Sequence, residues 1–433
     1  MLILIGMSAS AQNGLNSPYS QYGIGMTNLP YNMPSVSAMG GVVYTRSAFN
    51  SINPFNPASY ASIGMESFVF DMGLGIEMTT LREGDASLYD ADGNISYLTF
   101  GFPLTKWWKT AMGIMPMTDV SYRSVRAVTG EPWGEMNTIY EGFGGVTQFF
   151  WGHGFNILGG NNMDKAQLRA GFNVNYLYGY ITRAITYDFL GRDSTYFMDM
   201  QRRKETSISN FTFDFGLQYE QPIGKDYRLG AGVTLKLPRT MTVKDHAVVF
   251  TYGDSPRDTV FPASGGDSDY ESTLRQAFST GVGLSFQRND KWLFALDATF
   301  ASWNGMEYIE NSDFNIFGNS SLRYDNTYKF ALGFQLLGDK SASSYLRRIT
   351  YSVGGHYENG RLYLQFNDGV DRRLDEWGFG LGASLPMRKG KSVLNLSVSY
   401  SSFGTVDLMR RDAVMVGISI GSCESWFVKR KFN

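Results

Sequence analysis

Apolar residues alternate with small or polar residues along most of this chain. In the run from Phe211 to Glu220, FTFDFGLQYE, every second residue is large and apolar. The run from Trp377 to Ser384, WGFGLGAS, places glycines between its apolar positions. Successive side chains of a β-strand point to opposite faces, so this period of two predicts strands with one apolar face.

The pattern predicts fourteen such strands, joined by connections that alternate between short and long. The predicted strands begin near Met65, Ile95, Lys109, Thr138, Gln167, Thr195, Tyr227, Tyr270, Lys291, Leu322, Leu346, Arg373, Ser392 and Asp412. Short polar turns such as Thr105–Trp107 alternate with longer polar stretches, among them Arg82–Asn94, Arg123–Asn137, Gly191–Glu205 and Thr240–Asp269. Bacterial outer-membrane barrels have an even number of antiparallel strands, short periplasmic turns and longer outer loops. We therefore predict an all-β fold, a 14-stranded antiparallel transmembrane β-barrel with both termini in the periplasm.

The alternation also predicts which residues face the interior. The large apolar face is expected to contact lipid, and the opposite face, mainly Gly, Ser, Asn and Thr, is expected to line a narrow polar lumen. The charged residues predicted to face inward are Asp71, Glu77, Arg169, Asp214, Lys236 and Asp297. Fourteen strands of about 10 residues would cross the bilayer with only about 140 residues. Because the chain has 433 residues, we expect the strands to project beyond the membrane.

The N-terminal part of the chain does not alternate. Residues 1–11, with the apolar run MLILIGM and then Ala9-Ser10-Ala11, predict a secretory signal peptide, against a buried strand as the alternative. Residues 12–63 are rich in Asn, Ser, Pro and Gly but carry too many apolar side chains for a solvated linker. We expect these residues to form a plug or hatch, and residues 64–433 to form the barrel.

Composition excludes several other classes of protein. A net charge of -2 gives no basic surface for nucleic acid, and the mean hydropathy of -0.21 argues against helical membrane spans. One Cys excludes an internal disulfide framework, and three separated His exclude the usual zinc clusters. His153, His246 and His356 lie far apart in the chain, and the sequence establishes no partner within hydrogen-bond reach of any of them, so we predict no enzyme activity and no cofactor.

Two short motifs before the first predicted strand resemble those of the FadL-type outer-membrane transporter family, in a Bacteroidetes-like branch. One is Ala38-Met39-Gly40-Gly41, and the other is Asn53 followed by Asn56-Pro57-Ala58-Ser59. The resemblance implies a fourteen-stranded barrel with an N-terminal hatch, a gap in its wall, and diffusion of long-chain fatty acids or other hydrophobic compounds. It places Gly40, Gly41, Asn53, Asn56, Pro57 and Ala58 in the hatch.

Contacts with the membrane and with assembly proteins are also expected. The aromatic residues of the terminal strand, Trp426, Phe427 and Phe432, resemble the signal that barrel-insertion machinery recognises, with ordinary strand packing as the alternative. Basic pairs such as Arg202-Arg203 and Arg410-Arg411 are placed either to meet lipopolysaccharide phosphates or to lie on solvated strand extensions.

Two functions remain open from the sequence. The leading hypothesis is passive uptake of small, fatty-acid-like hydrophobic molecules through an outer-membrane FadL-like barrel. The alternative is a non-transporting accessory or scaffold barrel in a multi-protein outer-membrane machine for barrel assembly, protein secretion or nutrient uptake. The polar inner face favours the alternative, since it offers an apolar ligand a poor surface.

Overall fold

The computed structural model describes most of the chain from Ser17 to Ser425. The described residues are 17–27, 30–130, 134–160, 164–190, 198–252, 259–262, 269–303, 323–360, 362–365, 371–387, 392–405 and 409–425. The predicted signal peptide, residues 1–11, and the predicted assembly residues Trp426, Phe427 and Phe432 lie outside the described residues. In the described part, no helix is long and apolar enough to cross a membrane.

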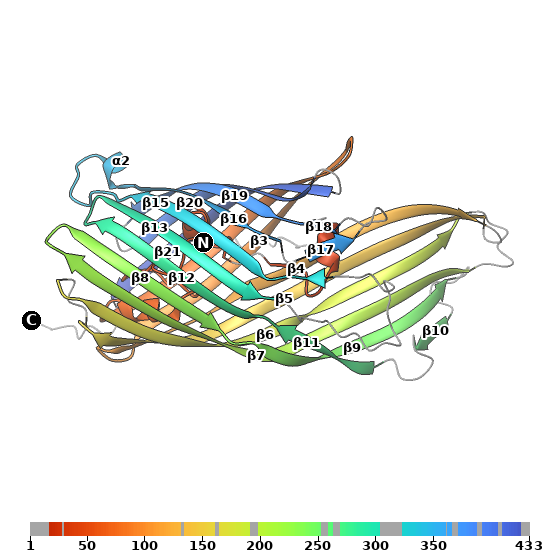
Figure 1. Ribbon diagram of the computed structural model, residues 1–433, viewed down its shortest axis with the longest axis horizontal. Helices are drawn as coiled ribbons and strands as arrows, with labels where there is room; N and C mark the ends of the chain where they lie inside the picture. Colours follow the sequence, from red (N-terminus) through yellow and green to blue (C-terminus); the bar gives the residue numbers. More distant parts are fainter. Residues whose placement is uncertain are drawn as a thin grey trace, which may run out of the picture.

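Fourteen antiparallel strands form a closed barrel, as the alternation predicts (Figure 1). They are β2 (Ser67–Glu83), β3 (Ala86–Pro103), β4 (Trp108–Gly130), β5 (Gly134–Leu158), β6 (Gln167–Phe189), β7 (Asp199–Ile223), β8 (Tyr227–Lys236), β12 (Phe278–Arg288), β13 (Trp292–Ser302), β15 (Thr327–Leu336), β16 (Thr350–Glu358), β19 (Glu376–Met387), β20 (Ser392–Thr405) and β21 (Met409–Ser425). The last strand pairs with the first from Ser67↔Ser425 to Arg82↔Arg410, which closes the ring.

The remaining elements lie at the two rims or inside the ring (Figure 1). β9 (Arg239–Tyr252) follows β8 after a break at Leu237-Pro238 and pairs with β7, with β10 (Thr259–Pro262) and with β11 (Asp269–Gln276). β14 (Arg323–Tyr324), β17 (Leu362–Gln365) and β18 (Asp371–Arg373) form a small separate sheet. The short elements are η1 (Pro18–Gln21), β1 (Met26–Thr27), α1 (Pro34–Ser37), η2 (Pro57–Ser62) and α2 (Tyr345–Arg348).

The barrel wall is much longer on one side than on the other. Strands β4 to β7 have 23 to 25 residues, whereas β8, β12, β13, β15 and β16 have 9 to 11. The prediction that Arg82–Asn94 and Arg123–Asn137 are long loops is therefore wrong: only Gly84-Asp85 separates β2 from β3, and β4 continues to Gly130. These extensions mix polar and apolar residues without a period of two, so they give no alternation signal, yet their backbone pairing continues. The expectation that strands project beyond an apolar band agrees with this geometry.

The outer face carries the apolar residues of the alternating pattern. On β7, the side chains of Phe211, Phe213, Phe215, Leu217 and Tyr219 are exposed, whereas those of Thr212, Asp214 and Gln218 between them are buried. A belt of large exposed apolar side chains continues around the other strands. This arrangement matches a barrel wall whose outer surface contacts lipid.

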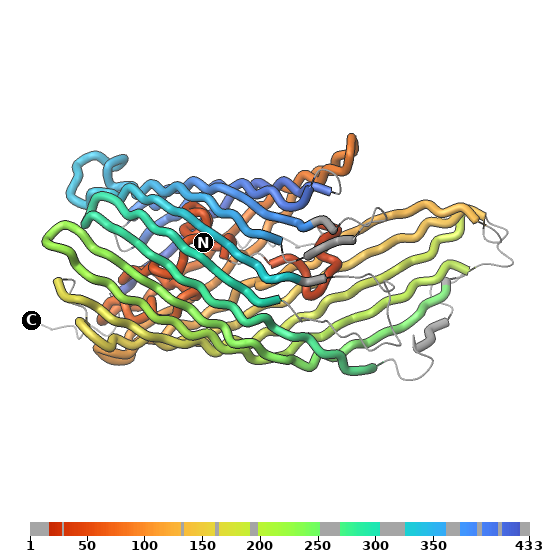
Figure 2. Tube along the Cα trace, viewed as in Figure 1, coloured from red at the N-terminus to blue at the C-terminus, as the bar shows by residue number. Residues whose placement is uncertain are grey.

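Residues 17–27 and 30–63, called here the lumenal segment, lie inside the ring of strands (Figure 2). Its apolar residues Met33, Val36, Val43, Ile52, Tyr60 and Ile63 pack in one buried cluster against wall residues Val69, Tyr97, Ala111, Met115 and Phe150. The folded core of the protein is thus formed between this segment and the inner wall.

Candidate functional site

Two asparagines of the predicted hatch motif hold the lumenal segment in its shape. The side-chain amide of Asn53 donates to the carbonyl oxygens of Val43 at 2.7 Å and Arg46 at 3.0 Å. Asn56 donates to the carbonyl oxygen of Tyr44 at 2.7 Å, and its Oδ1 accepts from the amide of Ala58 at 3.1 Å. Asn56 is therefore the N-cap of η2, in which Pro57 occupies the first turn where its missing N–H costs nothing.

The two motif glycines lie where the lumenal segment meets the wall. Gly40 and Gly41 follow α1 with positive φ angles of 66° and 91°, and the amide of Gly41 donates back to the carbonyl of Val36 at 3.0 Å. A Cβ on Gly40 would lie 2.2 Å from the amide nitrogen of Gly355 on β16. Glycine is required at Gly40 both for the left-handed backbone and for this close approach.

The inward acidic residue Asp297 on β13 binds the backbone of the lumenal segment. Its Oδ2 accepts from the amides of Val43 at 2.6 Å and Tyr44 at 2.9 Å. A second acidic residue, Glu220 on β7, accepts from Ser47 Oγ at 2.8 Å and pairs with Arg169 on β6 at 2.6 Å. Two of the wall charges in the lumen therefore hold the segment in place.

Two basic wall residues donate to the same segment. Lys109 on β4, fully buried, donates from Nζ to the carbonyl oxygen of Ala61 at 2.9 Å. Arg183 on β6 donates to the carbonyl oxygens of Gln21 at 3.2 Å and Gly23 at 2.5 Å. Neither residue was singled out as a segment contact from the sequence, although a lysine among the small inward residues of β4 is a signal for such a role.

The other predicted inward charges pair mainly with wall side chains. Asp71 accepts from the Tyr97 hydroxyl at 2.8 Å, Asp214 accepts from Asn175 at 2.9 Å, and Glu77 pairs with Arg411. Lys236 lines a lumenal cavity. Arg411, one of the expected lipopolysaccharide contacts, is 7% exposed, and this burial is inconsistent with a surface role.

A seam opens in the wall between β3 and β4. These strands pair only from Pro103↔Lys109 to Leu98↔Ile114, although β2–β3 pairing continues to Glu83↔Ala86 and β4–β5 pairing continues to Gly130↔Gly134. Beyond Leu98 the hairpin β2–β3 diverges from the pair β4–β5 (Figures 1 and 2). Leu74 on β2 and its partner Ile95 on β3 are about half exposed just past this point, so the seam begins within the apolar belt.

The lumenal segment covers the edge of β4 from Thr118 to Ser121, just after its pairing with β3 ends. Met26 and Thr27 of β1 pair with Asp119 and Thr118, and the amide of Ser17 donates to the carbonyl of Ser121 at 3.2 Å. Backbone groups at membrane depth need internal partners because lipid offers none. Tyr19 anchors this part by donating to the carbonyl of Met409 at 2.8 Å, and burial raises the pKa of its phenol to about 12.

The inner wall beside the seam carries an apolar cluster, which is a local exception to the predicted polar inner face. One buried cluster contains Val120, Tyr122, Val146, Leu177, Ile181, Ile208, Met241, Val243 and Leu274. On β4, an irregularity between Pro116 and Thr118 moves the inward positions from odd to even residue numbers, so Val120 and Tyr122 turn inward. A shift of one residue exchanges the two faces of a strand.

Several cavities remain between the lumenal segment and the wall. One of about 250 Å³ is lined by residues that include Tyr31, Tyr44, Lys236, Asp297 and Lys329. Another of about 450 Å³ is lined by residues that include Arg46, Ser47, Arg169, Glu220 and Arg228. Both contain several charged groups, which an apolar ligand would have to desolvate.

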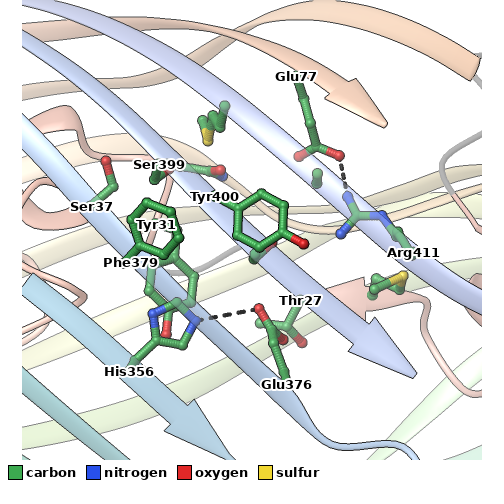
Figure 3. Close-up of a pocket in the computed structure, with 15 residues that line it drawn as sticks. Thr27, Tyr31, Ser37, Glu77, His356, Glu376, Phe379, Ser399, Tyr400 and Arg411 are labelled. Carbon is green, nitrogen blue, oxygen red and sulfur yellow. Dashed lines mark hydrogen bonds and ion pairs between the residues drawn. The ribbon is translucent and has the colours of Figure 1, made fainter. Parts of the chain in front are cut away.

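A smaller pocket of about 50 Å³ contains one of the three histidines (Figure 3). The ring of Tyr31 stacks on His356 with centroids 4.4 Å apart, and Nε2 of His356 lies 3.6 Å from Oε1 of Glu376. His153 packs beside Trp108, and exposed His246 pairs with Asp269 at 2.7 Å. The three histidines lie at separate sites, and among the described residues no group of His, Cys, Asp and Glu is placed to hold a metal ion.

A protein-family model, BamG, matches the chain from residue 1 to residue 433. The chain belongs to the BamG family. No curated protein sequence matches it.

Solved structures of outer-membrane channels have the same fold as this BamG-family chain. The toluene transporter TbuX of Ralstonia pickettii is 14% identical, with 90% of this chain and 97% of that chain covered and a TM-score of 0.53. A FadL homologue of Pseudomonas aeruginosa is 13% identical, with coverages of 95% and 98% and a TM-score of 0.52. At such identities the likeness confirms the predicted FadL-like barrel and leaves ligand and branch as predictions.

Proposed function

We propose that this chain is a non-transporting barrel subunit of the machinery that assembles other barrels in the outer membrane. Membership of the BamG family across the whole chain carries the proposal, because the name of that family connects it with barrel assembly. This was the alternative function from the sequence, and it sets the predicted fatty-acid uptake in second place. Both termini are proposed to lie in the periplasm, at the end with the short turns.

The contacts of the lumenal segment support a filled barrel. Asp297, Glu220, Lys109 and Arg183 lie on four different strands and each binds this segment. Buried charge-assisted hydrogen bonds are costly to break because each leaves an unpaired group behind. A segment held in this way suits a permanent plug better than a hatch that opens for each molecule.

Native purification tests the proposal. The protein is captured with an antibody from outer membranes dissolved in a mild detergent, and its companions are identified by mass spectrometry. We expect the barrel-inserting subunit of the assembly machinery among them, and depletion of this chain is expected to lower the amounts of other outer-membrane barrels. Recovery as a lone barrel, together with unchanged barrel levels after depletion, would contradict the proposal.

A second candidate is passive uptake of small hydrophobic molecules. The seam within the apolar belt and the apolar inner wall beside it favour this candidate. Proteoliposomes containing the purified protein test it with labelled oleate and with toluene. A plugged subunit gives uptake equal to that of empty liposomes, whereas a channel gives faster uptake.

A further inference from the structure

Within the described part of the chain, the outer part of β4, Arg123–Thr129, has an open strand edge. Its backbone pairs with β5 on one side, from Arg123↔Glu141 to Thr129↔Glu135. On the other side, pairing with β3 ends at Ile114, and among the described residues the hydrogen bonds from the lumenal segment to this edge end at Ser121. Among the described residues, no strand pairs with this side of Arg123–Thr129.

The hydrogen bonds of Ser121 show which backbone groups face the seam. Its carbonyl accepts from the amide of Ser17 at 3.2 Å, and its amide donates to Ser20 Oγ at 3.2 Å. In an antiparallel strand both groups of every second residue point to the same side. The amides and carbonyls of Arg123, Val125, Ala127 and Thr129 therefore point into the seam.

We propose that Arg123–Thr129 binds an antiparallel β-strand of a partner protein, which extends the sheet along β4. The lumenal segment already uses the adjoining part of the same edge in this way, since β1 pairs antiparallel with Thr118 and Asp119. Proline, a bulge or an inward charge usually protects an open edge. On β4 the proline and the irregularity lie at Pro116–Thr118, where the β1 pairing begins, and leave Arg123–Thr129 regular.

The side chains along this edge indicate the chemistry of the incoming strand. Val125 is 51% exposed on the outer face and Arg126 is exposed on the opposite face. Arg123 is paired with Glu141 at 2.8 Å, which leaves Arg126 as the cation for an incoming residue. The strand is expected to place an apolar residue beside Val125 and an acidic residue beside Arg126.

This inference rests on the proposed function for the identity of the partner, a subunit of the assembly machinery. Cross-linking in native outer membranes tests it with benzoyl-phenylalanine at position 125. The matched control places the same cross-linker at Thr186 on β6, which stands at the same height because Ile139 pairs with both Val125 and Thr186. β6 has pairing partners on both sides, so its backbone offers no open edge at this position.

We expect Val125→benzoyl-phenylalanine to give one discrete cross-linked product, which mass spectrometry maps to an extended segment of a machinery subunit. The yield of this product is expected to be at least tenfold higher than the yield with the cross-linker at position 186. Backbone dependence is tested with a cross-linker at Ala127 combined with Val125→Pro or Val125→Thr. The proline removes the seam-facing amide but no β4–β5 hydrogen bond, so it is expected to abolish the product, while threonine retains it. A cross-linker at position 125 in the otherwise unchanged chain decides the outcome if the proline variant does not fold.

Equal products at positions 125 and 186, no product at position 125, or a product unaffected by Val125→Pro in a folded barrel would each overturn the docking edge. A product with the mass of two copies of this chain would overturn the partner named here. Purification of the intact complex alongside a negative cross-link would leave the proposed function standing. If native purification of the unchanged chain recovers no complex, the proposed function itself is refuted.

Discussion

The carboxylate of Asp297 on β13 accepts a 2.6 Å hydrogen bond from the amide of Val43, which is 254 residues earlier in the chain. The same oxygen accepts from Tyr44, so one wall side chain satisfies two consecutive backbone donors in the lumen. We expect Asp297→Ala to loosen the lumenal segment, because the buried amide of Val43 and the partly buried amide of Tyr44 then lack this acceptor, at a cost of roughly 1–3 kcal/mol for a fully buried group. Protease cleavage within residues 40–50 of the purified protein measures this loosening. Asp226→Ala, in an exposed turn, is the control and should leave cleavage unchanged.

Close packing between β16 and the lumenal segment predicts a steric effect at Gly354. A Cβ there would lie 2.1 Å from the carbonyl carbon of Met39, and backbone cannot move aside as a flexible side chain can. We expect Gly354→Ala to reduce severely the fraction of folded barrel, measured by the heat-dependent change in gel mobility. Gly93→Ala, whose nearest neighbouring atoms are 3.8 Å away, should fold normally. Normal folding of both variants would contradict the tight contact.

The ion pair at Glu220 should matter more for stability than a surface pair on the same strand. Glu220 lies between Arg169 at 2.6 Å and Arg228 at 3.6 Å, with little exposure, whereas Glu205 and Arg203 are 3.7 Å apart and one-third or more exposed. Loss of one buried partner costs about 3–5 kcal/mol, and loss of a surface pair costs about 0–1 kcal/mol. We expect Glu220→Ala to lower the free energy of unfolding in urea well below that of Glu205→Ala. Similar free energies of unfolding for both variants would contradict a stabilising role for the buried Glu220 ion pair.

A disulfide between the lumenal segment and β4 distinguishes the two candidate functions. Thr27 and Thr118 are direct partners, and antiparallel partners bring Cβ atoms to about 4.5–5.5 Å. Thr27→Cys with Thr118→Cys, in a Cys423→Ser chain, should therefore link the lumenal segment to the edge of β4. A permanently plugged subunit should support growth equally well when oxidised and when reduced. Loss of growth or of hydrocarbon uptake only in the oxidised form would favour a moving hatch.

Period-two alternation was sufficient to predict the number of strands and the outward residues. It was informative because lipid selects large apolar side chains at every second position, as from Phe211 to Tyr219. Strand ends were less predictable, since Ala86–Asn94 pairs with β2 through backbone groups that leave no pattern in the side chains.

The interior was harder to predict because it depends on contacts between distant parts of the chain. The motif asparagines Asn53 and Asn56 were placed in a hatch by resemblance, and their partners Val43 and Tyr44 were visible only in the folded chain. The apolar inner face at Val120 was missed because the irregularity at Pro116 exchanges the two faces of β4. The seam begins where the β3–β4 pairing stops, at Leu98 and Ile114, and this point depends on both strands together.

The difference in length between the two sides of the barrel gives the molecule a direction within the membrane plane. Strands β4 to β7 exceed β15 and β16 by at least 13 residues, which at about 3.3 Å per residue is roughly 40 Å along the strand. A uniform cylinder would present the same height to neighbours at every angle. This barrel presents a tall wall on one side and a low rim on the other, so two neighbours that recognise different heights would be held around it in a fixed angular order.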